Sequence, residues 1–185
     1  MADNSFISKP FPPIRQATID LLNAASKKHM IHGFIEIDVT RIRQYLKKIK
    51  EETGESLSLT AFIIYCCAKA VDDNKHMQAC RNWRNQLIIF NDVDVSTTIE
   101  RLVEGRNEVV PTIIRAANRK SFREIHHDIR QAQSKSVVQT RVYRTIKAYL
   151  LIPSFIRRLA FRFLDRFPHL MKKHSGTIMI TSIGM

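Results

Sequence analysis

The sequence predicts a layered α/β domain with a mixed β-sheet. Segments in which hydrophobic residues recur every three or four positions alternate along the chain with segments in which they recur every second position. The 185 residues are 44% hydrophobic and include only 5 Gly and 6 Pro, which excludes a collagen-like or low-complexity chain. Helices intermixed with strands along a chain indicate helices packed on a sheet.

The first third of the chain predicts a short arm, a helix, a strand and two more helices. Residues 1–13 form the arm, and the first helix follows it. Over 33–39 every second residue is Ile or Val, which predicts a half-buried strand. The second helix ends near Gly54, as helices often do at glycine. The third, capped by Ser58 or Thr60, is apolar on nearly every side and is expected to be a core helix.

The middle of the chain predicts most of the sheet. A turn at Glu104–Asn107 joins two strands, and Pro111 places part of the second at an edge or in an irregular stretch. Ser121 and Glu124 have the spacing of a capping box, which predicts a helix start. The strands are expected at 87–90, 93–95, 99–103 and 109–114, with a last one at 177–181 after Gly176.

Positive charge is concentrated in one segment. The formal net charge is +13, and residues 141–173 hold nine basic residues and one acidic residue, or +8. This segment predicts two basic amphipathic helices separated by Pro153. Three interpretations stay open: the apolar sides pack on the domain or on another subunit, the helices attach to an anionic membrane surface, or they bind nucleic acid. The third is the least favoured, since no nucleic-acid-binding motif accompanies the charge.

Cysteine content and hydropathy predict a reduced, cytoplasmic protein. The three cysteines, Cys66, Cys67 and Cys80, have no regular spacing. The N-terminal residues lack the charged-then-apolar pattern of a signal peptide, and no run of 18 apolar residues occurs. His126 and His127 are adjacent and lack a third ligand at helical spacing, so we expect solvated histidines and no metal.

Several segments together resemble those of a known family: His32–Thr40, Ser58–Ile64, Val93–Val95, Val109–Ala117, Lys120–Ile125 and Gly176–Met185. In their order and spacing they are similar to the catalytic domain of the dihydrolipoamide acyltransferases, the acyltransferase cores of 2-oxoacid dehydrogenase complexes, which share a fold with chloramphenicol acetyltransferase. The resemblance covers about residues 14–135 and 175–185, and it implies a two-layer sandwich of this kind.

The resemblance implies acyl transfer between a thioester, of coenzyme A or a lipoyl group, and a thiol or other acceptor. It implies a homotrimer with coenzyme A as substrate and no metal. By position, Thr181 corresponds to the hydroxyl that stabilises the oxyanion, and His32 and Ser182 to substrate-binding positions. Arg15 corresponds loosely to an arginine that pairs with an aspartate of the catalytic motif. Interpretations without a function stay open: a β-branched residue that fills a sheet position at 181, a histidine whose hydrogen bonds are satisfied at a strand start at 32, and an exposed arginine at 15.

The chain departs from the family in two places. The turn after residue 103 lacks the family's Pro-Asp-Gly loop, and the basic segment is an insertion at 137–173 within a domain spanning 14–185.

The family's general base is a histidine in a His-x-x-x-Asp-Gly motif, and none of the seven histidines opens such a pattern. The sequence therefore predicts an acyltransferase domain that is incomplete at its C-terminus and inactive as this chain. The alternative is a non-catalytic interaction protein that uses the basic helices at 141–173.

Overall fold

The computed structural model describes residues 7–8, 11, 13–26, 28–103, 106–134, 148–164 and 166–182. Two compact units are present. One consists of residues 1–32 and 137–163, and the other of residues 33–136 and 164–185. The predicted turn at 104–107 and the first of the two predicted basic helices fall partly or wholly outside the described residues.

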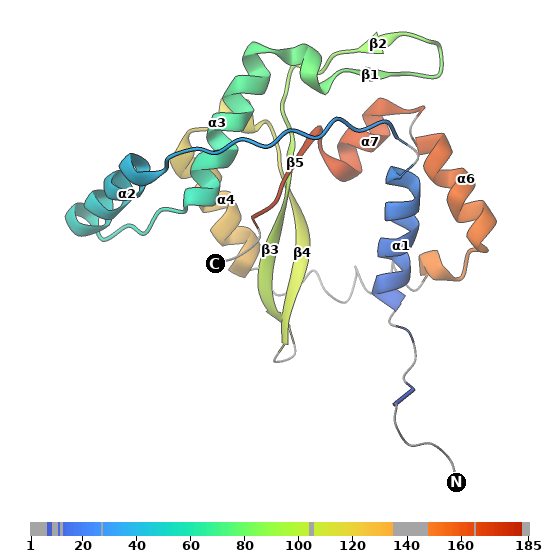
Figure 1. The fold of residues 1–185 in the computed structure, drawn as a ribbon, viewed down its shortest axis with the longest axis horizontal. Coiled ribbons are helices and arrows are strands. Elements are labelled where there is room, and N and C mark those ends of the chain that lie inside the picture. The colour runs from blue at the N-terminus through green and yellow to red at the C-terminus, as the bar shows by residue number, and fades with distance from the viewer. Residues whose placement is uncertain are drawn as a thin grey trace. The chain divides into compact units, whose positions relative to one another are not determined.

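The sheet lies in the second unit and is mixed, as predicted (Figure 1). Strand β3 (Val95–Val103) pairs antiparallel with β4 (Arg106–Ile114) and parallel with β5 (Ile178–Ile180), so the order is β4-β3-β5. Pro111 lies in β4, at the edge of the sheet, which is one of the two placements that the sequence predicted. A separate hairpin joins β1 (Cys80–Arg81) to β2 (Leu87–Ile88).

Helices α3 (Leu59–Asp73) and α4 (Phe122–Ser134) cover one face of the sheet and form the core with it. The buried cluster joins side chains of both helices to side chains of β3 and β4. This arrangement confirms the two-layer α/β class. The clustered residues are Ala61, Ile64, Ala68, Val71, Val93, Val95, Ile99, Ile114, Ala117, Ile125 and Ile129.

Local capping signals explain where the helices begin and end. Ser58 Oγ accepts a hydrogen bond from the Ala61 N–H at the start of α3. Ser121 N–H donates to Glu124 Oε2 at 2.7 Å, and Glu124 N–H donates to Ser121 Oγ at 3.3 Å, which confirms the capping box. Helix α2 (Thr40–Thr53) ends at Gly54, whose φ of 73° is left-handed.

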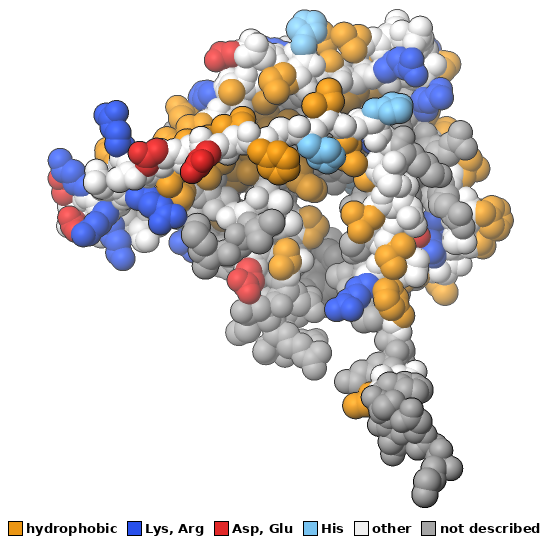
Figure 2. Space-filling model, in the orientation of Figure 1, with side chains coloured by type: hydrophobic (Ala, Val, Ile, Leu, Met, Phe, Trp, Pro, Cys, Tyr) orange, Lys and Arg blue, Asp and Glu red, His pale blue; other side chains and the backbone are white. Residues whose placement is uncertain are grey.

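One prediction from the hydrophobic period, the strand at 33–39, is wrong. Residues 29–39 form no strand and run as an extended trace whose hydrophobic side chains reach the surface (Figures 1 and 2). Phe34 is 98% exposed and Ile37 is 72% exposed, because no neighbouring strand pairs with this segment in the described part of the chain. Helix α3 contributes four residues to the core, as expected of a core helix, although it is buried along one side only, since Ile63 and Cys66 are exposed.

The other predicted strands are shorter or longer than expected. The strand expected at 87–90 ends at Ile88, and those expected at 93–95 and 99–103 are one strand that begins at Val95. After Pro153 the chain forms α6 (Ser154–Leu164), and a separate helix α7 (Pro168–Ser175) begins at a proline. Two short 3₁₀ turns occur at Lys75–Gln78 and Ala117–Arg119.

The first unit contains α1 (Pro13–Ala25) and most of α6. Asp20 on α1 is buried and forms an ion pair with Arg157 on α6 at 2.9 Å. Tyr149 OH donates a hydrogen bond to the same carboxylate at 3.1 Å. Among the described helices, none is long and apolar enough to cross a lipid bilayer.

Candidate active site

Thr181 directly follows β5 and is exposed. Strand β5 is held in parallel register with β3, with Thr97 opposite Ile180. Thr98 follows Thr97 and Thr181 follows Ile180, so the two threonines are neighbours, and their hydroxyl oxygens lie 2.7 Å apart. Val95 and Ile99 of β3 point into the core, so strand alternation places Thr98 on the other face of the sheet. Two hydroxyls therefore lie side by side on the face that α3 and α4 do not cover.

The approach to β5 is fixed by hydrogen bonds to the residue before β3. Thr177 N–H donates to the Asp94 carbonyl at 2.7 Å, and the Asp94 N–H donates to Thr177 Oγ1 at 3.1 Å. Gly176 precedes this contact with φ +72°, and a Cβ there would lie 2.6 Å from the Asp94 carbonyl oxygen. Only glycine fits both the conformation and the space. This close approach sets the register that brings Thr181 to Thr98.

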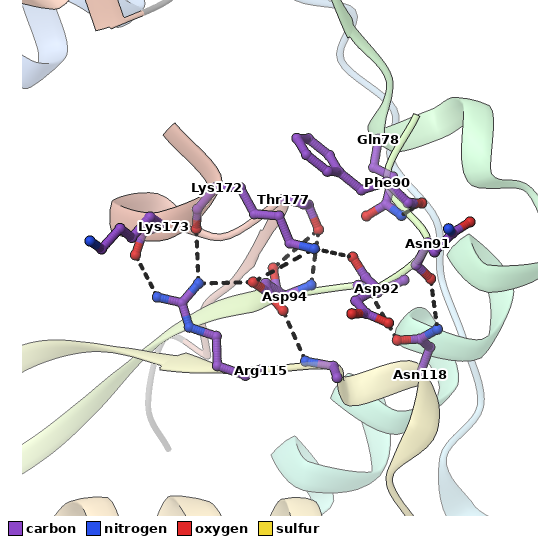
Figure 3. Close-up of polar contacts among 12 residues, drawn as sticks. Gln78, Phe90, Asn91, Asp92, Asp94, Arg115, Asn118, Lys172, Lys173 and Thr177 are labelled. Atoms are coloured by element: carbon purple, nitrogen blue, oxygen red, sulfur yellow. Dashed lines mark hydrogen bonds and ion pairs between the residues drawn. The ribbon is translucent and has the colours of Figure 1, made fainter. Parts of the chain in front are cut away.

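The Asp94 side chain ties α7 to the sheet (Figure 3). Its carboxylate is buried and accepts hydrogen bonds from Arg115 Nη1 at 2.8 Å and from the Ala116 N–H at 2.9 Å. Arg115 also donates to the carbonyls of Lys172 and Lys173 in the last turn of α7. A cation at a helix C-terminus satisfies carbonyls that have no partner within the helix. The start of β5 is thereby fixed at both α7 and β3.

Asn118 forms a second connection, between the sheet and α3. It is buried, its Oδ1 accepts from the Val93 N–H at 2.9 Å, and its Nδ2 donates to Asp72 Oδ1 at 2.9 Å. Lys69 Nζ on α3 donates to the Asn118 carbonyl at 2.6 Å. The backbone that leads into β3 is therefore anchored to the core helix.

The sequence model of one family, described as 2-oxoacid dehydrogenases acyltransferase (catalytic domain), matches residues 4–140. That match covers well over half of the 185 residues. The chain belongs to this family. The resemblance inferred from the sequence is thus confirmed. No curated protein gives a significant sequence match.

Solved acyltransferase structures share the fold of this family member. A probable dihydrolipoamide acetyltransferase from Listeria monocytogenes 4b F2365 is 20% identical, with a TM-score of 0.59 over 71% of this chain and 56% of that one. A dihydrolipoamide acetyltransferase from Azotobacter vinelandii is 15% identical, with a TM-score of 0.60 over 72% and 56%. The cubic core of a pyruvate dehydrogenase multienzyme complex is 14% identical, with a TM-score of 0.58 over 70% and 54%. The chain spans a little over half the length of these structures.

The residues predicted for the acyltransferase site fall in both compact units. Thr181 and the exposed Ser182 lie in the unit that holds the sheet. Arg15, exposed on α1, and His32, exposed at the start of the extended trace, belong to the other unit. The structure brings Thr181 together with Thr98, which sequence reasoning did not single out. A hydroxyl at position 98 becomes conspicuous only when the register of β3 and β5 is known.

Asp94 and Arg115 are two further residues whose roles sequence reasoning missed. Both lie in segments that carry the family resemblance, and the hairpin signal around residue 104 could have paired them. Val95 is opposite Ile114, so the residues just outside these two positions are neighbours.

His126 is not the solvated histidine that the sequence predicted. It is buried, and its Nδ1 accepts a hydrogen bond from the Ser58 N–H at 3.2 Å. Burial foremost, and the nearby Arg130 charge, lower the pKa of His126. Within the described ranges, no group of three or more His, Cys, Asp or Glu side chains is arranged to hold a metal ion.

Proposed function

We propose that this acyltransferase-family chain takes part in acyl transfer between a thioester of coenzyme A or a lipoyl group and a thiol. The proposal depends on one observation: the Thr181 hydroxyl is exposed at the end of β5, paired with a second hydroxyl on the sheet face opposite the core helices. A hydroxyl in that position is free to meet a substrate, whereas a threonine that only filled the sheet would be covered. His32, Ser182 and Arg15 remain proposed contributors through the family resemblance.

The chemistry requires a thiolate and a donor for the developing oxyanion. The thiolate attacks the thioester carbonyl carbon, the carbonyl oxygen becomes an oxyanion, and collapse of the tetrahedral intermediate expels the original thiolate. Thr181 Oγ1–H donates to that oxyanion, where one such donor contributes about 10²–10³ in kcat. The chain's sequence has no His-x-x-x-Asp-Gly base. Without a general base, turnover at neutral pH falls by about 10²–10⁴, so the inactivity that the sequence predicts applies at neutral pH, where the thiol is protonated.

Exchange between acetyl-coenzyme A and dihydrolipoamide tests this proposal. At a pH above the acceptor's thiol pKa the nucleophile is already ionised, so the contribution of the hydroxyl is measured without a base. We expect the chain to accelerate exchange over the uncatalysed reaction at this pH and Thr181→Val to remove most of the acceleration. Thr97→Val is the matched control, because Thr97 is the buried β3 residue next to Thr98. Equal rates for the chain and Thr181→Val would contradict the proposal.

We also propose that the chain assembles into a homo-oligomer, and specifically a trimer. The support is the likeness of its fold to a cubic multienzyme core. Light scattering of the purified 21.5 kDa chain tests this proposal. A mass of three chains is expected, and a mass of one chain at every accessible concentration contradicts it.

A second candidate function is attachment to an anionic membrane surface. Helix α6 leaves a row of large hydrophobic side chains exposed: Phe155 is 68% exposed, Leu159 64% and Phe163 61%. These positions are four residues apart on one side of the helix and lie within the basic segment, a combination typical of interfacial helices. Flotation with phosphatidylserine-containing vesicles tests this candidate. Binding at low salt that weakens at high salt supports it, and absence of binding at low salt excludes it.

A further inference from the structure

The hydrogen bond between the Thr98 and Thr181 hydroxyls can run in either direction, since either oxygen can be the donor at 2.7 Å. A hydroxyl carries one proton and two acceptor lone pairs. If Thr181 donates its proton to a substrate oxyanion, as in the proposed function, it has none left for Thr98. The Thr98–Thr181 hydrogen bond then forms only with Thr98 as the donor.

We propose that Thr98 is a positioning residue that donates a hydrogen bond to Thr181 Oγ1 and so directs the Thr181 proton at the oxyanion. The inference rests on the proposed function and extends it to a residue on another strand. The Thr98 bond occupies one lone pair of Thr181 Oγ1 and restricts rotation of its hydroxyl. A donor that is oriented before the reaction needs no reorganisation as charge develops. Donation from Thr98 also polarises the Thr181 O–H and strengthens its own donation.

The surroundings of Thr98 suit this role. It lies within β3, the central strand, with β4 on one side and β5 on the other. Its neighbours Thr97 and Ile99 are buried in the opposite face, which fixes the backbone beneath it. As a β-branched residue in a strand, Thr98 has few χ1 rotamers available. Thr181, by contrast, is exposed just after the last residue of an edge strand. The hydrogen bond therefore runs from a constrained side chain to a freer one.

The exchange assay with acetyl-coenzyme A and dihydrolipoamide, at a pH above the thiol pKa, tests the inference. Thr98→Val keeps the shape of the side chain and removes its hydroxyl, whereas Thr98→Ser keeps the hydroxyl. We expect Thr98→Val to lower kcat about 3- to 10-fold with KM unchanged, because one neutral hydrogen bond is lost. Thr98→Ser should retain most of the rate. Thr97→Val, next to it on the buried face, should match the unmodified chain.

The double variant separates positioning from a structural effect. If Thr98 acts through Thr181, Thr98→Val adds no further loss when Thr181 is already Val. Additive losses, an effect on KM alone, or failure of Thr98→Ser to rescue the rate would each overturn the inference. Thermal unfolding by circular dichroism verifies that the variants fold.

The same data distinguish the two levels of the proposal. If Thr181→Val lowers the exchange rate and Thr98→Val leaves it unchanged, the role of Thr98 is overturned and the proposed function stands. No acceleration by the unmodified chain, or no effect of Thr181→Val, overturns both.

Discussion

Gly176 is a position where any side chain would force the sheet apart. Its φ of +72° is unfavourable for other residues, and a Cβ would lie 2.6 Å from the Asp94 carbonyl oxygen and 3.1 Å from the Ser96 nitrogen. Both contacts are with backbone atoms, which cannot move without shifting the start of β3. The residue thus links a backbone conformation to the placement of β5 and Thr181.

We predict that Gly176→Ala lowers the free energy of unfolding by about 2–4 kcal/mol, from backbone strain together with the clash. Gly54→Ala is the matched control, because Gly54 has nearly the same φ, +73°, with no atom near the added Cβ. Strain alone should cost it about 1–2 kcal/mol. Urea denaturation measures both. Equal decreases in the free energy of unfolding would show that the close approach of residue 176 to Asp94 does not contribute to the destabilisation.

The protonation state of His126 affects the hydrogen bonding at the start of α3. Its Nδ1 accepts the Ser58 N–H, which requires an unprotonated ring nitrogen, and burial lowers the pKa of the side chain below its usual 6.5. Arg130 and His127 lower that pKa further, whereas Glu55 opposes them. The folded state therefore binds the proton less readily than the unfolded state. The stabilisation is complete above pH 6.5 and declines as the pH falls from there toward the lowered pKa.

We predict that the free energy of unfolding decreases between pH 7.5 and pH 5.5, and that His126→Asn makes this decrease smaller. Asparagine offers an acceptor oxygen close to the position of Nδ1 and does not titrate. His127→Asn, at the exposed neighbouring position, is the control and should retain most of the pH dependence, because burial is the largest cause of the lowered His126 pKa. Urea denaturation at the two pH values measures the slopes. Identical slopes for both variants would rule out His126 as the titrating group.

The Asp94–Arg115 pair connects three elements, β3, β4 and α7. Arg115 is about half exposed, so water screens part of its attraction for Asp94, but Asp94 itself is 7% exposed. Removal of the guanidinium leaves a buried carboxylate with the Ala116 N–H at 2.9 Å and Lys172 at 3.9 Å. It also removes a donor from the carbonyls of Lys172 and Lys173, although the Lys172 carbonyl keeps the Gly176 N–H at 3.0 Å.

We predict that Arg115→Met costs about 1–3 kcal/mol and speeds amide hydrogen exchange in β5, because α7 no longer holds the strand's start. The control is Glu51→Gln on α2, which removes an exposed Lys47–Glu51 pair at 3.8 Å and should change little. Denaturation and site-resolved exchange measure these effects. Unchanged exchange in β5 would show that the backbone contacts of Thr177 suffice.

In the molecule as a whole, the first unit joins residues that are far apart in sequence. Asp20 on α1 and Arg157 on α6 form an ion pair in which the side chains are 7% and 8% exposed. Arg157 also donates to the carbonyls of Leu150 and Ile152, and Tyr149 OH donates to Asp20. Burial, and then the Asp20 carboxylate, raise the pKa of Tyr149. The cluster satisfies its own charges and so permits their burial.

We predict that Arg157→Met costs about 3–5 kcal/mol, because Asp20 then stays buried without a counter-charge. The double variant Asp20→Leu/Arg157→Met should recover most of that loss, since it leaves no unpaired charge. Arg15→Met on the exposed side of α1 is the control and should unfold like the unmodified chain. Denaturation and hydrogen exchange in α1 measure the result. A double variant as unstable as the single one would argue that packing, not charge, holds this unit together.

Much of the fold was predictable from residues close together in the chain. Gly54 ends α2, Ser58 caps α3, and Ser121 with Glu124 starts α4, as their local chemistry indicates. The extended segment at 33–39 shows where such reasoning fails. Alternating Ile and Val indicate an extended backbone, but a strand also needs a partner, and the pattern contains no information on whether one is present.

The sequence also predicted Thr181 as a site residue, because the residues around it match the family. It did not predict which residues lie next to Thr181 in space. Capping, turns and hydrophobic period depend on residues a few positions apart, and these determined the elements and the fold class. The pairing of Thr98 with Thr181 and of Asp20 with Arg157 was decided only by the folded chain. Contacts across strands and between distant helices depend on register and packing, which arise when the whole chain closes around its core.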